Sequence, residues 1–172
     1  REGETVLVLG ATGTLGLIAV QAAKLLGAGR VVAAGRRPEG LKRAVAYGAD
    51  STVQIDTFGT DAPQTLAAAL SEACGGNGPT LVIDPLWGEP FVAALEAAAF
   101  GARIVQLGQS AGGDSVIASK LVRGKAIDIL GFSNFRVPRD VLHQGIRELV
   151  NHANEARITF DFERISLADA GV

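Results

Sequence analysis

The stretch Gly10-Ala11-Thr12-Gly13-Thr14-Leu15-Gly16 decides the fold expected of this chain. It lies between an apolar run at residues 5–9 and a segment with helical character at residues 15–26. A strand that turns through glycines into a helix forms an anion site, because the helix N-terminus offers unpaired N–H groups and partial positive charge. Glycines also serve turns in proteins that bind no nucleotide. The position of the motif inside a strand–turn–helix–strand unit favours the nucleotide-binding interpretation.

Short apolar segments alternate with segments rich in Ala and Leu along the whole chain, a pattern typical of a parallel sheet built from βαβ units. The expected strands are residues 5–10, 30–35, 51–55, 80–84, 102–108 and 126–132. The expected helices are residues 15–26, 38–47, a segment that follows Asp61 and stops at Gly75-Gly76, and residues 90–99, 115–122 and 138–153. In the first helix, the expected stripe toward the sheet is Leu15, Ile18, Ala22 and Leu25, with Gly27 and Gly29 ending the helix.

These segments predict an α/β, doubly wound Rossmann fold with a six-stranded parallel sheet in the order 3-2-1-4-5-6 and helices on both faces. In such a sheet, ligands bind beyond the carboxyl ends of the strands, at the switch point between the first and fourth strands. We therefore expect the site there.

Composition limits the possible partners. The chain has 172 residues, 48% of them hydrophobic, with a net charge of −2 and a mean hydropathy of +0.27. This net charge lacks the positive excess that is typical of nucleic-acid-binding domains. No apolar run approaches the ~20 residues that a membrane-spanning helix needs. Cys74 is the only cysteine, which rules out an internal disulfide and suits the reducing cytoplasm. The absence of methionine predicts that the chain is a piece of a longer protein.

The end of the second strand indicates which cofactor is bound. Nineteen residues after Gly16, where many NAD-binding domains carry an acid for the ribose 2′-OH, this chain has Gly35, followed by Arg36 and Arg37. The arginines supply positive charge where a 2′-phosphate would lie, although two such residues can also be simply solvated. One Arg–phosphate bond of roughly 1.5–3 kcal/mol favours NADPH over NADH by about 10- to 150-fold. We therefore expect NADP(H).

Several segments together resemble the medium-chain dehydrogenase/reductase superfamily. The segments are residues 3–16, Ala19-Val20-Gln21-Ala22-Ala23-Lys24, Tyr47-Gly48-Ala49-Asp50, Val82-Ile83-Asp84-Pro85, residues 101–108 and Gly131-Phe132-Ser133-Asn134. Within that superfamily, the Gly-x-x-Gly-x-x-Gly turn and Gly108-Gln109-Ser110-Ala111-Gly112 look most like the zinc-independent quinone oxidoreductase branch.

The resemblance implies a two-domain enzyme of which residues 1–157 form the NADP(H)-binding Rossmann domain. It implies that the Gly13–Leu15 turn holds the pyrophosphate, that Pro85 and Leu86 lie near the ribose, and that Gly108, Gln109, Phe132 and Ser133 approach the nicotinamide. The expected cofactor-binding residues are Gly10, Thr12, Gly13, Thr14, Leu15, Gly35, Arg36, Arg37, Pro85, Leu86, Gly108, Gln109, Ser110, Phe132 and Ser133. The branch often places a lysine or a tyrosine on the 2′-phosphate, but those positions here hold Gly40 and roughly Ile55. Arg36 or Arg37 must then take that role, with Lys42 or Arg43 nearby.

The resemblance also implies a separate, GroES-like catalytic domain that is absent here. Residues 158–172 would then be a tail that belongs to this missing domain, poorly packed or docked on a neighbour. Because residues 158–162 alternate apolar and polar, an ordinary edge strand is the alternative. We assign no catalytic residue to this chain.

Other chemistry is weakly supported. His143 and His152 lie nine positions apart on one expected helix, so they face opposite sides and predict no metal site. Cys74 is expected to be a small packing residue, Asp84 to form a turn or cap a helix, and Trp87 to cover the sheet edge.

Other functions share parts of this sequence pattern. A short-chain reductase needs Tyr-x-x-x-Lys after the fourth strand, whereas the only tyrosine is Tyr47, with Ser51 four residues on. A zinc-dependent alcohol dehydrogenase or enoyl reductase stays open, as does a non-enzymatic NADPH-sensing module. For the full-length protein we expect a small-molecule electron acceptor, and a homodimer through the exposed edge strand from Ala126 to Phe132.

Overall fold

The computed structural model describes residues 1–55 and 62–169. The elements are β1 (Thr5–Val8), α1 (Thr14–Leu25), β2 (Arg30–Gly35), α2 (Pro38–Ala46), β3 (Ser51–Gln54), α3 (Ala62–Ala73), β4 (Leu81–Asp84), α4 (Gly88–Ala97), β5 (Arg103–Gln106), α5 (Ser119–Gly124), β6 (Asp128–Gly131), α6 (Arg139–Asn154) and the 3-10 helix η2 (Leu167–Asp169). The strands form one parallel sheet in the order β3-β2-β1-β4-β5-β6. This confirms the predicted fold class and strand order.

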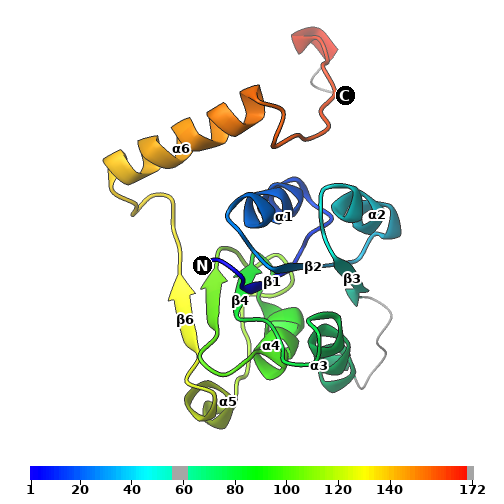
Figure 1. Ribbon diagram of the computed structural model, residues 1–172, viewed down its shortest axis with the longest axis vertical. Helices are drawn as coiled ribbons and strands as arrows, with labels where there is room; N and C mark the ends of the chain where they lie inside the picture. Colours follow the sequence, from blue (N-terminus) through cyan, green and yellow to red (C-terminus); the bar gives the residue numbers. More distant parts are fainter. Residues whose placement is uncertain (56–61, 170–172) are drawn as a thin grey trace.

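The two faces of the sheet carry separate apolar layers (Figure 1), with α1 and α2 on one side and α3, α4 and α5 on the other. Val6, Val8 and Val31 point toward the first pair of helices, whereas Leu7 and Val82 point toward the second group. Successive side chains of a strand alternate between faces, so a strand covered on both sides must be apolar throughout. The central strands meet this requirement, and the site at their carboxyl ends is therefore built on a rigid base.

The inward face of α1 differs from the predicted one. The predicted stripe was Leu15, Ile18, Ala22 and Leu25, but the buried residues of α1 are Gly16, Leu17, Val20 and Gln21. Leu15 is 51% exposed. A Cβ added to Gly16 would lie 2.4 Å from the carbonyl oxygen of Gly10, so this glycine must face the preceding turn. The close approach of Gly16 to the turn sets the rotation of α1 about its own axis. The pattern of apolar residues alone does not determine this rotation.

Some element boundaries also differ from the prediction. The first strand ends at Val8 because Gly10 adopts a φ of +62° and turns the chain. Gly27, with a φ of +86°, follows the end of α1, whereas Gly29 packs against the carbonyl oxygen of Gly3. The helix predicted at residues 115–122 begins at Ser119 instead. The third helix agrees with the prediction, because α3 begins at Ala62, directly after Asp61, and ends at Ala73, shortly before Gly75-Gly76.

The C-terminal part of the chain lies apart from the sheet (Figure 1). Helix α6 buries none of its residues. The alternative of an edge strand at residues 158–162 is wrong, because no strand forms there. The segment instead touches α1: the buried side-chain amide of Gln21 donates to the Thr159 carbonyl and accepts from the Thr159 N–H, both at 2.8 Å. Ile158 is buried beside this contact.

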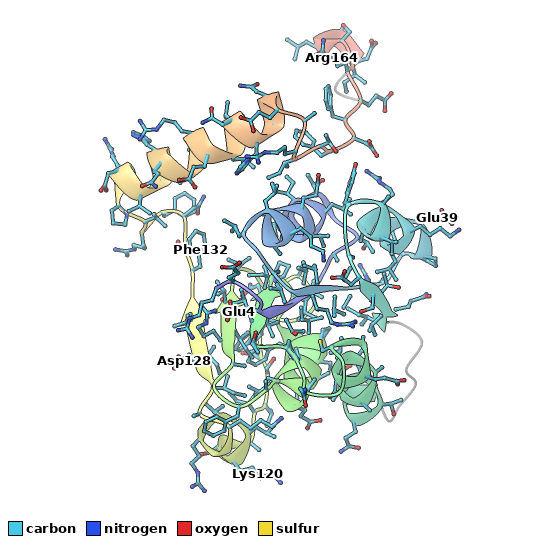
Figure 2. All side chains as sticks on the ribbon, viewed as in Figure 1. Glu4, Glu39, Lys120, Asp128, Phe132 and Arg164 are labelled. Atoms are coloured by element: carbon cyan, nitrogen blue, oxygen red, sulfur yellow. The ribbon has the colours of Figure 1, made fainter. Side chains whose placement is uncertain are left out.

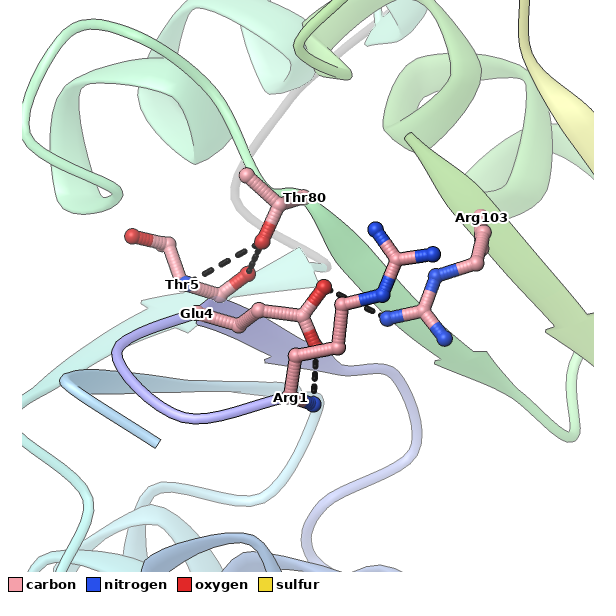
Figure 3. A network of polar contacts seen from close by, with 5 residues as sticks. All are labelled: Arg1, Glu4, Thr5, Thr80 and Arg103. Carbon is pink, nitrogen blue, oxygen red and sulfur yellow. Dashed lines mark hydrogen bonds and ion pairs between the residues drawn. The ribbon is translucent and has the colours of Figure 1, made fainter. Parts of the chain in front are cut away.

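A polar network lies at the end of the sheet where the strands begin (Figure 3). The Glu4 carboxylate accepts a hydrogen bond of 2.5 Å from Arg103, and Thr80 exchanges hydrogen bonds of 3.2 Å with the backbone of Thr5. Burial opposes the charge on Glu4, but hydrogen bonds from the N-terminal amine and from Arg103 hold its pKa below the usual range. This network ties β1, β4 and β5 together at the end opposite the site.

Candidate functional site

The turn between β1 and α1 presents unpaired backbone donors. Ala11 N–H donates to the Ala34 carbonyl at 2.9 Å, and Gly13 N–H donates to the Gly10 carbonyl at 3.1 Å, which fixes the turn against β2. Among the described residues, the N–H groups of Thr14, Leu15 and Gly16 find no acceptor, and no side chain caps α1. These three groups begin a 12-residue helix, where the helix dipole adds positive potential. The turn can therefore hold an anion.

Thr12 fills the space between the end of β2 and helix α2. A Cβ added to Gly35 would lie 2.5 Å from Thr12 Cγ2, and one added to Gly40 would lie 2.5 Å from Thr12 Cβ. Neither position can therefore hold a side chain unless Thr12 moves. Crowding by Thr12 explains why Gly40 stands where related proteins often have a lysine. The same crowding explains why Gly35 stands where NAD-binding domains often have an acid.

Arg36 and Arg37 follow β2 at the rim of this region. Arg37 adopts an extended backbone conformation (φ −87°, ψ 118°) before Pro38 and is the N-cap residue of α2. Its guanidinium Nη2 donates to the Thr12 carbonyl at 2.5 Å. Arg36 is exposed and lies on the same rim. Two arginines thus lie on one rim of this region.

The wall opposite the turn follows β4. The Asp84 Oδ1 accepts hydrogen bonds from the N–H groups of Leu86 (2.8 Å) and Trp87 (3.0 Å), so Asp84 forms the predicted turn. Trp87 takes an unusual φ of +57° and stacks on Phe91 with ring centroids 4.1 Å apart. It is a packing residue, as expected. The Leu86 carbonyl accepts from Ala111 N–H at 2.8 Å, which joins this wall to the loop after β5.

Asp84 is fully buried, and within the described part of the chain its Oδ2 has no hydrogen-bond partner. Burial raises the pKa of this carboxyl, and the two N–H donors offset the rise only in part. The folded state therefore binds this proton more tightly than the unfolded state does.

A pH-dependent stability follows from Asp84. Because its folded pKa is raised, its contribution to stability is full below the unfolded pKa of about 4 and is lost as pH rises through the folded pKa. Each tenfold difference in proton affinity between the folded and unfolded states is worth about 1.4 kcal/mol. Asp84→Asn keeps the Oδ1 acceptor and removes the charge. As the pH rises from 4 to 8, we expect the free energy of unfolding of Asp84→Asn to increase relative to that of the wild type. Urea unfolding at several pH values measures it, and a pH-independent difference would refute it.

The turn and the opposite wall enclose a cleft of about 1090 Å³ at the carboxyl ends of the strands, between β1 and β4. The predicted site residues that line it are Gly10, Thr12, Gly13, Gly35, Arg36, Arg37, Leu86 and Ser110. The lining residues that sequence reasoning did not select are Pro38, Ile55, Leu66, Gly88, Glu89, Pro90, Ala111, Gly112 and Asp114. Most of these lie three to six residues after the end of a predicted strand, and that position is the signal that would have selected them.

Other predicted site residues lie outside the lining of the cleft. They are Thr14, Leu15, Pro85, Gly108, Gln109, Phe132 and Ser133. Pro85 contacts the turn from beneath, because a Cβ on Gly10 would lie 3.2 Å from its ring. Phe132 follows the end of β6 and is 49% exposed (Figure 2). The roles of all these residues stay predictions.

Three further observations bear on the sequence predictions. No cluster of His, Cys, Asp and Glu that could hold a metal ion occurs among residues 1–55 and 62–169. Cys74 is buried in the core, and burial raises the pKa of its thiol to about 11, consistent with a packing role. Across the same described ranges, every helix is too short or too polar to pass through a bilayer.

Comparison with known proteins places these features in a family. A family model described as zinc-binding dehydrogenase matches residues 14–151. Quinone oxidoreductase-like protein 2 of Rattus norvegicus is 33% identical over 76% of this chain and 36% of its own length. The solved structure of mycobacterial Rv1454c complexed with NADPH is 27% identical with a TM-score of 0.84, over 99% of this chain and 52% of that one. An NAD-dependent alcohol dehydrogenase is 29% identical with a TM-score of 0.75, over 92% and 42%.

This chain thus spans only 36% to 52% of the length of these relatives. The family model nevertheless covers residues 14–151, which is most of the chain. The resemblance noted in the sequence is confirmed: the chain belongs to the zinc-binding dehydrogenase family, the cofactor domain of the medium-chain dehydrogenase/reductases, with quinone oxidoreductase-like proteins among its relatives.

Proposed function

We propose that residues 1–157 form the NADP(H)-binding domain of an oxidoreductase whose full-length protein reduces a quinone or an enone by hydride transfer from NADPH. One observation carries the cofactor assignment. The unpaired N–H groups of Thr14, Leu15 and Gly16 directly follow Gly13, which lines the cleft whose rim carries Arg36 and Arg37. A dinucleotide with a 2′-phosphate has anionic groups at two separate places, and this cleft offers donors for both.

The chain's own residues would bind and orient the cofactor, which supplies the hydride when bound. The turn from Gly10 to Leu15 would hold the pyrophosphate, and Pro85 and Leu86 would lie near the ribose. Gly108, Gln109 and Ser110, with Phe132 and Ser133, would approach the nicotinamide. Residues 158–172 would lead into a second, GroES-like domain that carries the catalytic groups.

The names of the relatives support the choice of acceptor. Quinone oxidoreductase-like protein 2 and a mycobacterial structure bound to NADPH are among them. A second candidate is the cofactor domain of an alcohol dehydrogenase, because an NAD-dependent alcohol dehydrogenase is also a structural neighbour. The absence of an acid at Gly35 argues against that candidate, since NAD-binding domains commonly carry an acid there. An enoyl reductase and a non-enzymatic NADPH-sensing module would use the same cofactor cleft.

Cofactor titration followed by turnover tests this proposal. We expect the protein to bind NADPH about 10- to 150-fold more tightly than NADH, the ratio of one Arg–phosphate bond. The full-length protein should then oxidise NADPH with quinones or enones, with and without a chelator. Tighter binding of NADH, or turnover only of alcohols and aldehydes that a chelator abolishes, would favour the dehydrogenase. Binding of NADPH without turnover of any acceptor would favour the sensor.

We also propose a homodimer through β6, in the reducing cytoplasm that a single buried cysteine suits. β6 is an edge strand, paired only with β5, and Leu130 is 46% exposed. The N–H groups of Asp128 and Phe132, two residues labelled in Figure 2, donate to the carbonyls of Ala102 and Gln106. By alternation, the N–H groups of Ile129 and Gly131 point away from β5. A second copy can pair with this edge across a twofold axis.

Light scattering at micromolar concentration should therefore show a dimer. Gly131→Lys would place a like charge from each copy at this proposed interface and should give monomer. Gly113→Lys is the matched control, because both glycines are exposed and neither has an atom within 4 Å of an added Cβ. A monomeric wild type, or equal effects of the two substitutions, would refute this interface.

A further inference from the structure

Four cationic side chains cluster around the start of α2: Arg36, Arg37, Lys42 and Arg43. The structure distinguishes them by their partners. Lys42 Nζ pairs with Glu39 at 2.8 Å, and Arg43 pairs with Asp161 of the C-terminal segment. Arg37 is bound to the Thr12 carbonyl. Within the described part of the chain, Arg36 alone of the four makes no hydrogen bond or ion pair.

The contact of Arg37 braces the turn. Thr12 is confined on two sides, because its side chain occupies the space that a Cβ on Gly35 or Gly40 would need. The hydrogen bond from Arg37 to the Thr12 carbonyl fixes the backbone immediately before Gly13, which is the N-cap residue of α1. The unpaired N–H groups follow directly. A guanidinium committed to this carbonyl sets where those donors point.

Arg36 differs in each of these respects. Its side chain is exposed on the rim of the cleft, and Glu39, the nearest acid in sequence, already pairs with Lys42. A guanidinium is always charged and presents a planar set of donors that matches a phosphate. Among residues 1–55 and 62–169, no hydrogen bond or ion pair has to break before Arg36 binds a phosphate.

From these contacts we propose that the adjacent arginines have different roles, an inference that rests on the proposed function. Arg36 binds the 2′-phosphate and so selects NADP(H) over NAD(H). Arg37 is a positioning residue that holds the glycine turn for the pyrophosphate, which both dinucleotides share.

Single substitutions measured on both nucleotides separate the two roles. Arg36→Gln should weaken NADPH by about 10- to 150-fold, the value of one charge-assisted bond, and should leave NADH within about twofold and the melting temperature of the nucleotide-free protein unchanged. Arg37→Gln should weaken NADPH and NADH by similar factors, so that their ratio stays within about twofold, and should lower that melting temperature. In Arg36→Gln, 2′,5′-ADP should compete less well with bound NADPH than it does in the wild type, whereas competition by 5′-AMP should be unchanged.

Arg43→Gln is the matched control, because it removes the same charge from a residue already paired with Asp161, and it should preserve the nucleotide ratio. Loss of the NADPH preference in Arg37→Gln but not in Arg36→Gln would overturn the division of roles while leaving the proposed function intact. A wild-type protein that binds neither nucleotide would refute the proposed function and this inference with it. If Arg43→Gln lost as much of the NADPH preference as Arg36→Gln, the preference would depend on the overall positive charge of this region. That result would overturn the specific role of Arg36.

Discussion

Gly16→Ala is expected to weaken NADPH and NADH alike by about 10- to 100-fold and to destabilise the fold by about 1–3 kcal/mol. A Cβ at this position would lie 2.4 Å from the Gly10 carbonyl oxygen and 2.5 Å from Ala11 Cα. Both are backbone atoms, so no side-chain rotation relieves the overlap. The helix must move away from the turn, and the unpaired N–H groups move with it. Nucleotide titration and urea unfolding of the same variant measure the two effects.

Gly145→Ala provides the matched control. Gly145 also lies within a helix, α6, but an added Cβ there has no atom within 4 Å. Alanine stabilises an exposed helix interior by up to about 1 kcal/mol relative to glycine, so this variant should be as stable as the wild type or more so. The same substitution should thus have opposite signs at the two positions. A neutral Gly16→Ala variant would show that the close packing of helix and turn is not required.

The strand order and the position of the site could be predicted from the sequence because they depend on local patterns. Six β-branched runs, the glycine turn and Gly35-Arg36-Arg37 each carry their signal within a few residues. The rotation of α1 could not be predicted in this way. Its apolar residues allow more than one stripe, and the contact of Gly16 with Gly10 selects among them.

The parts of the site that sequence reasoning missed depend on contacts between distant segments. Gly40 looked like a lost lysine position, but it faces Thr12, 28 positions earlier. Lys42 and Arg43 looked available for a phosphate, yet each already has an acidic partner. The docking of Thr159 on Gln21 likewise joins residues 138 positions apart. Charge and spacing along the chain do not reveal such pairs.

Phe91→Ala is expected to lower the free energy of unfolding by about 3–5 kcal/mol, a large part of the roughly 5–15 kcal/mol of a typical domain. Phe91 is fully buried in the first turn of α4 and stacks on Trp87. Its removal leaves a cavity under the wall of the cleft, where Trp87 and Gly88 both adopt positive φ. The unfolding midpoint in urea should fall with little change in slope, because the same surface is exposed on unfolding.

Two further variants separate packing from the loss of an aromatic ring. Phe91→Leu refills most of the cavity and should recover much of the stability, leaving a loss of about 1–2 kcal/mol. Phe100→Ala removes an equally large side chain that is 80% exposed, and its effect should stay within about 0.5 kcal/mol. Since Trp87 leads directly into the wall formed by Gly88, the nucleotide affinity of Phe91→Ala should also fall, and Phe91→Leu should restore it. An alanine variant with wild-type stability would mean that α4 repacks without Phe91, and the wall would then not depend on this core residue.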